Sequence, residues 1–112
     1  MKICYILTRS DAIGGVQIHV RNFSKMMNDK MHEAHIIVGG NGPYVQQLVD
    51  EGHNVHSTKF LRKNINPIFD LFAFFELIIC LRGIRPEIVS THSSKAGVLG
   101  RLASKLLGIP VI

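Results

Sequence analysis

Apolar runs of strand length alternate with helical patterns along the chain. Residues 3–8 form a continuous apolar run, which is typical of a strand buried on both faces of a sheet. The Gly14-Gly15 pair then interrupts the chain, and the apolar residues that follow recur every three or four positions, as on one face of a helix. That face is formed by Val16, Val20, Phe23 and Met27.

The same alternation continues to the end of the sequence. The further predicted strands are residues 34–38, 54–57, 87–91 and 110–112, of which the last is only begun. The further predicted helices are residues 44–51, 67–81 and 95–107, with a loop at residues 61–66. Strands that alternate with helices predict an α/β fold, a Rossmann-like three-layer αβα sandwich in which right-handed βαβ units build a parallel sheet.

The order of the strands tells where a ligand would bind. We expect the order 3-2-1-4-5, numbered along the chain, which places the reversal of the order between the first and the fourth strand. Ligands of such folds bind outside the carboxyl ends of the strands at this point. Two predicted loops face this crevice, at residues 9–15 and 92–95. Functional side chains are therefore expected in these two loops.

The first crevice loop combines Arg9 and Ser10 with the Gly14-Gly15 pair. Glycines in front of a helix let a ligand approach the backbone closely and leave N–H groups facing outward, which suits a phosphate. The alternative is a turn that only needs residues able to adopt positive φ angles. The loop matches neither the G-x-G-x-x-G pattern nor a Walker A loop, which argues against a dinucleotide-binding or kinase-type site.

The second crevice loop places an imidazole, two hydroxyls and an ammonium group at the start of a helix, on His92, Ser93, Ser94 and Lys95. His92 is expected at the carboxyl end of a central strand, where it can hydrogen-bond a polyol or a phosphate. One of the serines can instead serve as the helix N-cap, which is the favoured interpretation for them. Within the helix, Gly97 and Gly100 indicate close packing against the sheet or, less favoured, close approach of a ligand.

Composition narrows the functional classes. With 112 residues, 46% of them hydrophobic, the chain has the size of one domain with its own core. Its net charge of +5 attracts phosphates, but no run of Lys and Arg exceeds two residues, so we expect no nucleic-acid partner. Cys4 and Cys80 lie in apolar runs and are interpreted as buried reduced thiols. The first residues have no signal-peptide pattern, so a cytoplasmic location is expected.

The other histidines are not expected to bind a metal. His32 and His35 flank the start of one predicted strand, and His53 and His56 flank another. A spacing of three residues along a strand places the two members of each pair on opposite faces. No set of His, Asp and Glu residues has the spacing of a zinc site, so no metal is expected.

The predicted helix at residues 68–81 is apolar almost all round. Its aromatic residues are Phe69, Phe72, Phe74 and Phe75. The apolar stretch is too short to span a membrane, and we favour a helix covered on both sides, by the sheet and by a second surface. The alternative is an exposed patch for a lipid surface or a partner protein. Three nearby cations would then meet lipid head groups: Lys59, Arg62 and Lys63.

Two segments resemble a known enzyme family. Residues 14–20, GGVQIHV, are similar to the GGxExH start of glycosyltransferase family 4 proteins. Residues 85–97, RPEIVSTHSSKAG, are similar to the more specific RPDIVHTHSSKAG segment of the same family. Residues 99–103 and 108–112 extend the resemblance, which covers essentially the whole chain.

The resemblance implies a GT-B fold, in which two Rossmann-like domains face a cleft and residues 1–112 form the N-terminal, acceptor-side domain. Gly14 and Gly15 would approach the diphosphate or the sugar of a nucleotide-sugar donor, and His92 would contact the donor sugar near the reaction centre. The remaining loop residues would line the acceptor side of the cleft: Arg9, Ser10, Ser93, Ser94 and Lys95.

The activity that the resemblance implies is a retaining sugar transfer without a metal or another cofactor, to a glycan or a lipid-linked acceptor, in polysaccharide or cell-envelope synthesis. Gln17 stands where the family usually has Glu, which puts an acidic role there in doubt. The C-terminal, nucleotide-sugar-binding domain and its paired glutamates are not in this sequence, so we expect these 112 residues alone to be inactive. The apolar helix allows a peripheral contact with the inner face of the cell membrane.

Two other functions stay open. Another GT-B enzyme, such as a nucleotide-sugar 2-epimerase, would place carboxylates and histidines in the crevice, where the sequence offers chiefly Asp11 and His92. A non-enzymatic flavodoxin-like binding or receiver module is the third hypothesis. A receiver would have an acidic cluster after the first strand and a carboxylate on the third, and the sequence has neither. The glycosyltransferase is favoured.

Overall fold

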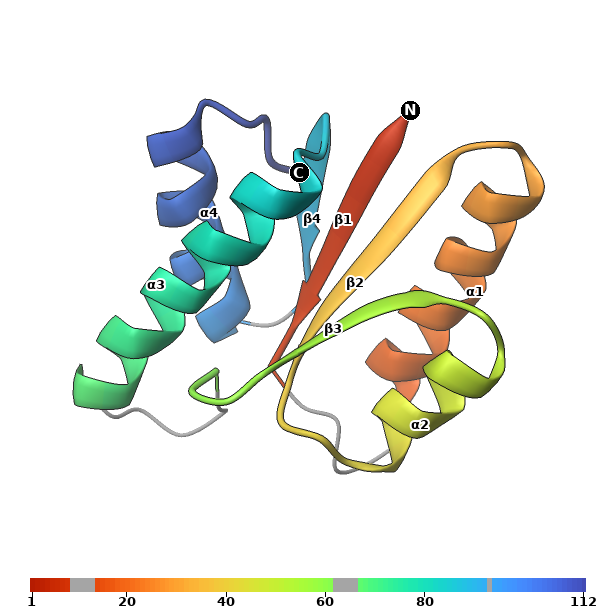
Figure 1. Ribbon diagram of the computed structural model, residues 1–112, viewed down its shortest axis with the longest axis horizontal. Helices are drawn as coiled ribbons and strands as arrows, with labels where there is room; N and C mark the ends of the chain where they lie inside the picture. Colours follow the sequence, from red (N-terminus) through yellow and green to blue (C-terminus); the bar gives the residue numbers. More distant parts are fainter. Residues whose placement is uncertain (9–13, 62–66, 93) are drawn as a thin grey trace.

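Four parallel strands form one sheet, with helices on both of its faces (Figure 1). The computed structural model describes residues 1–8, 14–61, 67–92 and 94–112. The strands are β1 (Lys2–Leu7), β2 (Glu33–Gly39), β3 (Asn54–Thr58) and β4 (Ile88–Thr91). The helices are α1 (Gly15–Asp29), α2 (Pro43–Asp50), α3 (Pro67–Ile84) and α4 (Ser94–Leu107). Each of these elements was predicted from the apolar pattern, within three residues at either end.

The strand order is β3-β2-β1-β4, and all neighbours are parallel. Beyond α4, Val111 forms a parallel bridge with Val89 of β4, which places the start of a fifth strand next to β4. The predicted order 3-2-1-4-5 is therefore confirmed. It puts the carboxyl ends of β1 and β4 side by side, at the point where the order of the strands reverses.

Alternate residues of β1 contribute to two separate hydrophobic cores. Ile3, Tyr5 and Leu7 pack on the face that α1 and α2 cover. Cys4 and Ile6 pack on the opposite face, beneath α3 and α4. Figure 1 shows the two helix pairs on the two sides of the sheet. Because both faces are covered, β1 is buried from its second residue to its last, and this explains its uninterrupted apolar sequence.

The buried face of α1 begins one turn later than the apolar spacing predicts. Val20 is fully buried and Phe23 packs partly buried beside it, but Val16 is 45% exposed. The next buried residue is polar. Ser24 is fully buried because its hydroxyl hydrogen-bonds Nδ1 of His53 at 2.8 Å, just before β3. Ser24 is thus buried at a position where the apolar pattern alone predicts exposure to solvent, because it makes a polar contact with another element.

Helix α3 continues past its predicted end at residues 81–83. Ile84 is 5% exposed and belongs to the core beneath α3, so burial favours one further helical residue. The helix stops at Arg85, whose φ is 54° and whose N–H donates to the Leu81 carbonyl at 2.8 Å. Pro86 follows, and a residue before proline is disfavoured in the right-handed helical region. The terminator is therefore the Arg85-Pro86 pair and not Gly83.

The outer face of α3 is exposed. The helix packs its inner face into the core through Ala73, Leu77, Leu81 and Ile84. On its outer face large apolar side chains are between 46% and 71% exposed: Ile68, Leu71, Phe72, Phe75 and Ile79. Within the described residues these side chains are exposed, so the second covering surface stays a prediction for this face. Among the described residues, no helix is long and apolar enough to cross a membrane.

Both cysteines carry free thiols, as predicted. Cys4 of β1 is fully buried, while Cys80 of α3 is partly exposed. Burial raises the pKa of the Cys4 thiol far above its ordinary value, and the neighbouring Cys80 acts in the same direction. The Cys4 thiol is therefore protonated and unreactive at neutral pH.

The two glycines of α4 differ in how closely the sheet approaches them. A Cβ atom on Gly100 would lie 2.9 Å from Cγ2 of Thr91 and 3.2 Å from Cδ1 of Ile6. A Cβ atom on Gly97 would meet nothing closer than Oγ1 of Thr91, at 3.7 Å. Close packing therefore explains Gly100, as expected, whereas Gly97 has room for a methyl group.

We expect Gly100→Ala to lower the free energy of unfolding by about 1–3 kcal/mol, because the added methyl group overpacks the contact between α4 and the sheet. Gly97→Ala is the matched control. It should raise the free energy of unfolding by up to about 1 kcal/mol, because alanine favours a helix and the site has space. Urea denaturation followed by circular dichroism measures both. Equal stability of the Gly100→Ala variant and the original chain would contradict the packing argument.

Candidate functional site

His92 lies directly after β4, at the carboxyl edge of the sheet. Its N–H donates to the Ile6 carbonyl of β1 at 3.0 Å, so the backbone of His92 is fixed to the neighbouring central strand. The side chain is half-buried. The structure thus places His92 where the strand order predicts it, between β1 and β4.

The imidazole of His92 is held by residues of the sheet. The Ser90 hydroxyl hydrogen-bonds Nε2 of His92 at 2.8 Å, and Ser90 is only 9% exposed. The ring centroid of Tyr5 lies 5.7 Å away, at an interplanar angle of 47°. No contact with Nδ1 of His92 is found among the described residues. One ring nitrogen is therefore engaged with the protein.

A second histidine faces His92 from α1. The ring centroids of His19 and His92 are 6.3 Å apart, with an interplanar angle of 62°. His19 also makes an edge contact with Phe23, at 4.3 Å between centroids, which fixes it on the helix. Burial lowers the pKa of His92, and His19 lowers it further. Because the ordinary pKa is 6.5, the His92 ring is neutral at pH 7 and can offer either a donor or an acceptor.

The Gly14-Gly15 pair forms the start of α1, as predicted. Gly14 is the N-cap residue and Gly15 the first helical residue. The Gly14 N–H donates to Oε1 of Gln17 at 3.1 Å, so Gln17 caps the helix from its third position. The Tyr44 hydroxyl of α2 donates to the Gln17 carbonyl at 2.7 Å. Gln17, which replaces the usual Glu of the family pattern, thus has a structural role in ordering this turn.

Phosphate binding by this turn stays a prediction. The Gly14 N–H is engaged with Gln17, so an anion could reach it only after that side chain moves. At Gly15 an added Cβ would meet no atom within 4 Å, which means that the surface there is open. His19, four residues further along α1, lies beside His92. The start of α1 and the end of β4 therefore belong to one site.

Several predicted site residues are not placed by the structure. Arg9, Ser10 and Ser93 lie outside the described residues. Ser94 is the first residue of α4 and Lys95 the second, so Ser94 is already helical and is not the N-cap. The N-cap interpretation of Ser93 stays a prediction. The predicted roles in lining the acceptor side likewise stay predictions.

Sequence reasoning missed three residues that shape the His92 environment, namely Tyr5, His19 and Ser90. A signal existed for two of them. Residues two apart on a strand share a face, which relates Ser90 to His92, and adjacent strands bring Tyr5 opposite Ser90. For His19 the helical spacing predicts which face of α1 it lies on, but not which residue it contacts. Packing against the sheet sets the rotation of α1 and so decides that contact.

Two of the histidines in or beside the predicted strands pair across strands and not along one. Nδ1 of His35 in β2 lies 3.1 Å from Nε2 of His56 in β3, and the ring centroids are 5.4 Å apart. Nε2 of His35 lies 2.7 Å from a carboxylate oxygen of Glu33. The sequence interpretation considered each pair within its own strand and so missed this contact. Within the described residues, no group of three or more His, Cys, Asp or Glu side chains could hold a metal ion.

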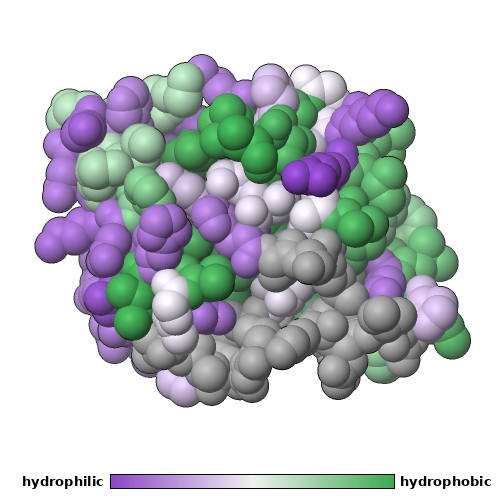
Figure 2. Space-filling model, turned by 180° about the vertical axis from the view of Figure 1, so that it is seen from behind, coloured by the Kyte–Doolittle hydropathy of each residue, from purple (hydrophilic) through white to green (hydrophobic). Residues whose placement is uncertain are grey.

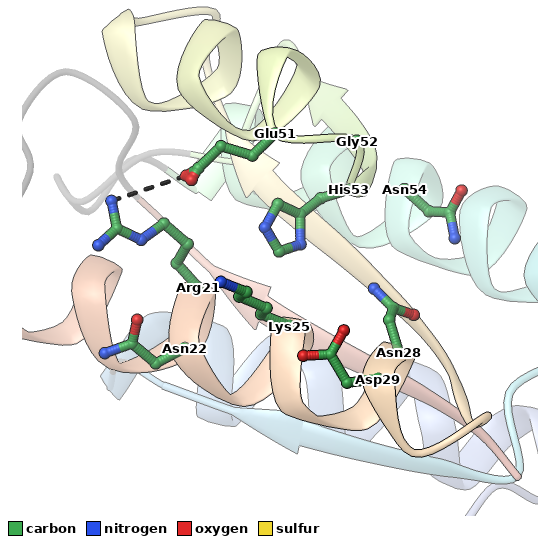
Figure 3. Close-up of a pocket in the computed structure, with 9 residues that line it drawn as sticks. All are labelled: Arg21, Asn22, Lys25, Asn28, Asp29, Glu51, Gly52, His53 and Asn54. Carbon is green, nitrogen blue, oxygen red and sulfur yellow. Dashed lines mark ion pairs between the residues drawn. The ribbon is translucent and has the colours of Figure 1, made fainter.

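A pocket lined by described residues lies away from His92 (Figure 3). It has a volume of about 590 Å³ and lies between the second half of α1 and the connection from α2 to β3. Its lining residues are Arg21, Asn22, Lys25, Asn28, Asp29, Glu51, Gly52, His53 and Asn54. Asn54 is the first residue of β3, so the pocket is at the amino edge of the parallel sheet, whereas His92 is at the carboxyl edge. No sequence pattern indicated it.

Comparison with known proteins identifies the family. The family model described as Glycosyltransferase Family 4 matches residues 13–112, which is most of the chain and includes both resembling segments. The chain belongs to glycosyltransferase family 4. The resemblance on which the site residues were predicted is thereby confirmed.

Two relatives of the chain are named as transferases. An Escherichia coli UDP-Gal:alpha-D-GlcNAc-diphosphoundecaprenol alpha-1,3-galactosyltransferase is 32% identical over 101 residues, which cover 89% of this chain. A Campylobacter jejuni N,N'-diacetylbacillosaminyl-diphospho-undecaprenol alpha-1,3-N-acetylgalactosaminyltransferase is 31% identical over 86 residues, or 77% of this chain. The matched regions span only 26% and 23% of these relatives.

Solved structures show the same fold. MurG of Acinetobacter baumannii superimposes on 98% of this family 4 chain with a TM-score of 0.78 and 20% identity, over 33% of its own length. A UDP-GlcNAc 2-epimerase from Neisseria meningitidis, bound to UDP-GlcNAc, covers 99% of the chain with a TM-score of 0.73, over 31% of its own length and with 13% identity. The fold is the Rossmann-like α/β half found in GT-B enzymes.

We expect His19→Gln to raise the pKa of His92, because the variant removes a neighbouring imidazole that disfavours a second positive charge. The pKa is read from the Cε1 proton of His92 in an NMR titration. His32→Gln is the control, since His32 contacts the N-terminal amino group and not His92. If the His92 pKa stays the same or falls in His19→Gln, the two rings are not electrostatically coupled.

Proposed function

We propose that this chain is the acceptor-side, N-terminal domain of a retaining glycosyltransferase that moves a sugar from a nucleotide-sugar donor to a lipid-linked saccharide. The family supports a transferase, and both relatives are named for acceptors linked to diphospho-undecaprenol. The position of His92 carries the proposal: a neutral, half-buried imidazole is fixed at the reversal of the strand order. The product would enter polysaccharide or cell-envelope synthesis.

The geometry suits His92 for orienting a sugar. Ser90 engages Nε2, so Nδ1 is the nitrogen that would hydrogen-bond a hydroxyl of the donor sugar near the reacting carbon. A neutral ring stabilises this contact without adding charge next to the sugar. Held from the sheet by Ser90 and by its own backbone, the ring is pre-oriented for a transition-state contact.

Groups other than His92 would stabilise the negative charge of the departing nucleotide. We propose that a second domain holds the nucleotide, and that its basic residues and backbone N–H groups stabilise the leaving diphosphate. The amide of Gly15, the first residue of α1, would approach the same diphosphate. No step of this transfer uses a metal ion.

A second candidate is a nucleotide-sugar 2-epimerase, which the similarity to the epimerase fold favours. Such an enzyme needs carboxylates near the sugar ring. The described side chains in contact around His92 are those of Tyr5, His19 and Ser90, and none of them is a carboxylate. Asp11, the carboxylate that the sequence offers in the crevice, lies outside the described residues. Because both relatives are named as transferases, the transferase is the preferred function, and the release of free nucleotide with and without acceptor distinguishes the two.

We expect His92→Gln, in a longer protein that contains this chain, to lower kcat by about 100-fold, because a donor-sugar contact made in the transition state is lost. Transfer of radiolabelled hexose to a diphospho-undecaprenol-linked acceptor measures it. His32→Gln should keep full activity, and the 112 residues alone should show no turnover. A His92→Gln enzyme with unchanged kcat, or transfer by the 112 residues alone, would contradict the proposed division of roles.

We further propose that the outer face of α3 rests on the inner surface of the membrane that carries the acceptor. This apolar surface is formed by Ile68, Leu71, Phe72, Phe75 and Ile79. In Figure 2 hydrophobic side chains are more frequent on the side of α3 and α4, and hydrophilic ones predominate on the side of α1 and α2. Exposed cations flank the surface at Lys59, Arg82 and Arg85, and these suit anionic lipid head groups.

We expect Phe75→Ser to weaken binding to vesicles that contain phosphatidylglycerol by about tenfold, because an apolar side chain that would enter the lipid is lost. Val49→Ser is the matched control: Val49 lies on α2 and is as exposed as Phe75, at 52%. Cosedimentation with vesicles measures both. Equal losses for the two variants would show that α3 is not the contact surface, and equal binding to vesicles without anionic lipid would show that the flanking cations do not contribute.

A further inference from the structure

The pocket at the amino edge of the sheet is lined by polar residues whose charges cancel. Arg21 and Lys25 project from α1, and the carboxylates of Asp29 and Glu51 balance them. Nη1 of Arg21 lies 3.7 Å from Oε1 of Glu51, and Figure 3 shows this pair closing one side of the pocket. With two cations and two anions, the pocket has no preference for a charged ligand.

Two amides at the other side of the pocket are fixed before any ligand arrives. Oδ1 of Asn28 accepts a hydrogen bond from the Ala34 N–H at 3.1 Å. Nδ2 of Asn54 donates to the Ala34 carbonyl at 3.2 Å. The two side chains thus hold the same residue of β2 from opposite directions. The NH₂ group of Asn28 and the carbonyl oxygen of Asn54 then provide one oriented donor and one oriented acceptor.

His53 adds a third oriented group. Its Nδ1 lies 2.8 Å from the hydroxyl of the fully buried Ser24, so the ring is fixed, and Figure 3 shows it pointing from the α2–β3 connection towards α1. Burial lowers the pKa of His53, and Arg21 and Lys25 act in the same direction against Glu51. The ring is neutral at pH 7, and Nε2 can exchange one hydrogen bond with a ligand.

We propose that this pocket binds a neutral saccharide. Each sugar hydroxyl is both a donor and an acceptor, which suits the paired amides and the neutral imidazole. Because the two cations and the two carboxylates balance, an ionic ligand gains no net attraction, and an apolar ligand would leave the fixed polar groups without partners. The volume of about 590 Å³ is in the range of small-molecule sites.

The pocket is separate from the proposed transfer site. It lies at the amino edge of the sheet, so a saccharide there does not occupy the space next to His92 at the carboxyl edge. The inference therefore goes beyond the proposed transferase activity. The pocket would be a second saccharide-binding site on the chain, apart from the transfer site.

Amide chemical shifts of the ¹⁵N-labelled chain test the proposal. Methyl α-D-galactoside should shift the amides of Asn22, Lys25 and His53 with a dissociation constant on the order of millimolar, and leave the Gly14 and His92 amides in place. Glucuronate, of similar size but anionic, and inorganic phosphate should shift the pocket amides less. If phosphate or glucuronate produces the larger shifts, or if the neutral sugar shifts none of the three amides, the proposal is wrong.

Asn28→Asp isolates the contribution of the pocket. The aspartate keeps an oxygen that accepts from the Ala34 N–H, but it replaces the donor that faces the pocket with a carboxylate oxygen. Binding of methyl α-D-galactoside should weaken at least about tenfold, because a donor is lost and a charge is gained. Asn41→Asp, at an exposed position outside the pocket, is the charge-matched control and should bind like the original chain. Equal affinities of the two variants would overturn the assignment.

Discussion

The hydrogen bond from His92 to the Ile6 carbonyl depends on the burial of one strand. β1 has a hydrogen-bonded neighbour on each side and a hydrophobic core on each face, so its position leaves almost no freedom. Because β4 pairs with this fixed strand in parallel, the residue that follows β4 must lie at the carboxyl end of β1. The site is thus positioned by backbone pairing in the most buried part of the molecule, and its own side chains need only be oriented.

Orientation within the site comes from a short chain of polar contacts. Ser90 lies on the buried α1 face of β4 and engages Nε2 of His92, which selects the nitrogen that remains for a ligand. At the facing helix, Gln17 engages the N–H of Gly14. Both contacts order the backbone and side chains around the site without adding charge.

The sequence was sufficient to predict the features that depend on the period of the apolar residues and on the order of the strands and helices. The alternation of strand and helix patterns predicted the three layers, and the expected strand order predicted the neighbours of β1. Together they predicted the position of His92. Features that depend on register or on packing between distant segments were missed. His35 and His56 pair only because β2 and β3 adopt one particular register, and Val16 is exposed because α1 meets the sheet one turn later. The pocket combines residues of α1 with the turn before β3, which no local pattern relates.

The three surfaces of the chain differ in the partner that each one can accept. The carboxyl edge offers a neutral imidazole and an open helix start, which suit a sugar and a phosphate. The outer face of α3 offers apolar side chains flanked by cations, whereas the amino edge beside α1 offers balanced charges and fixed amides. Since α1 and α3 cover opposite faces of the sheet, a membrane contact through α3 would leave the polar pocket in solvent. In the three proposed roles, a lipid, a donor sugar and a free glycan would each meet a different side of the same sheet and so stay apart.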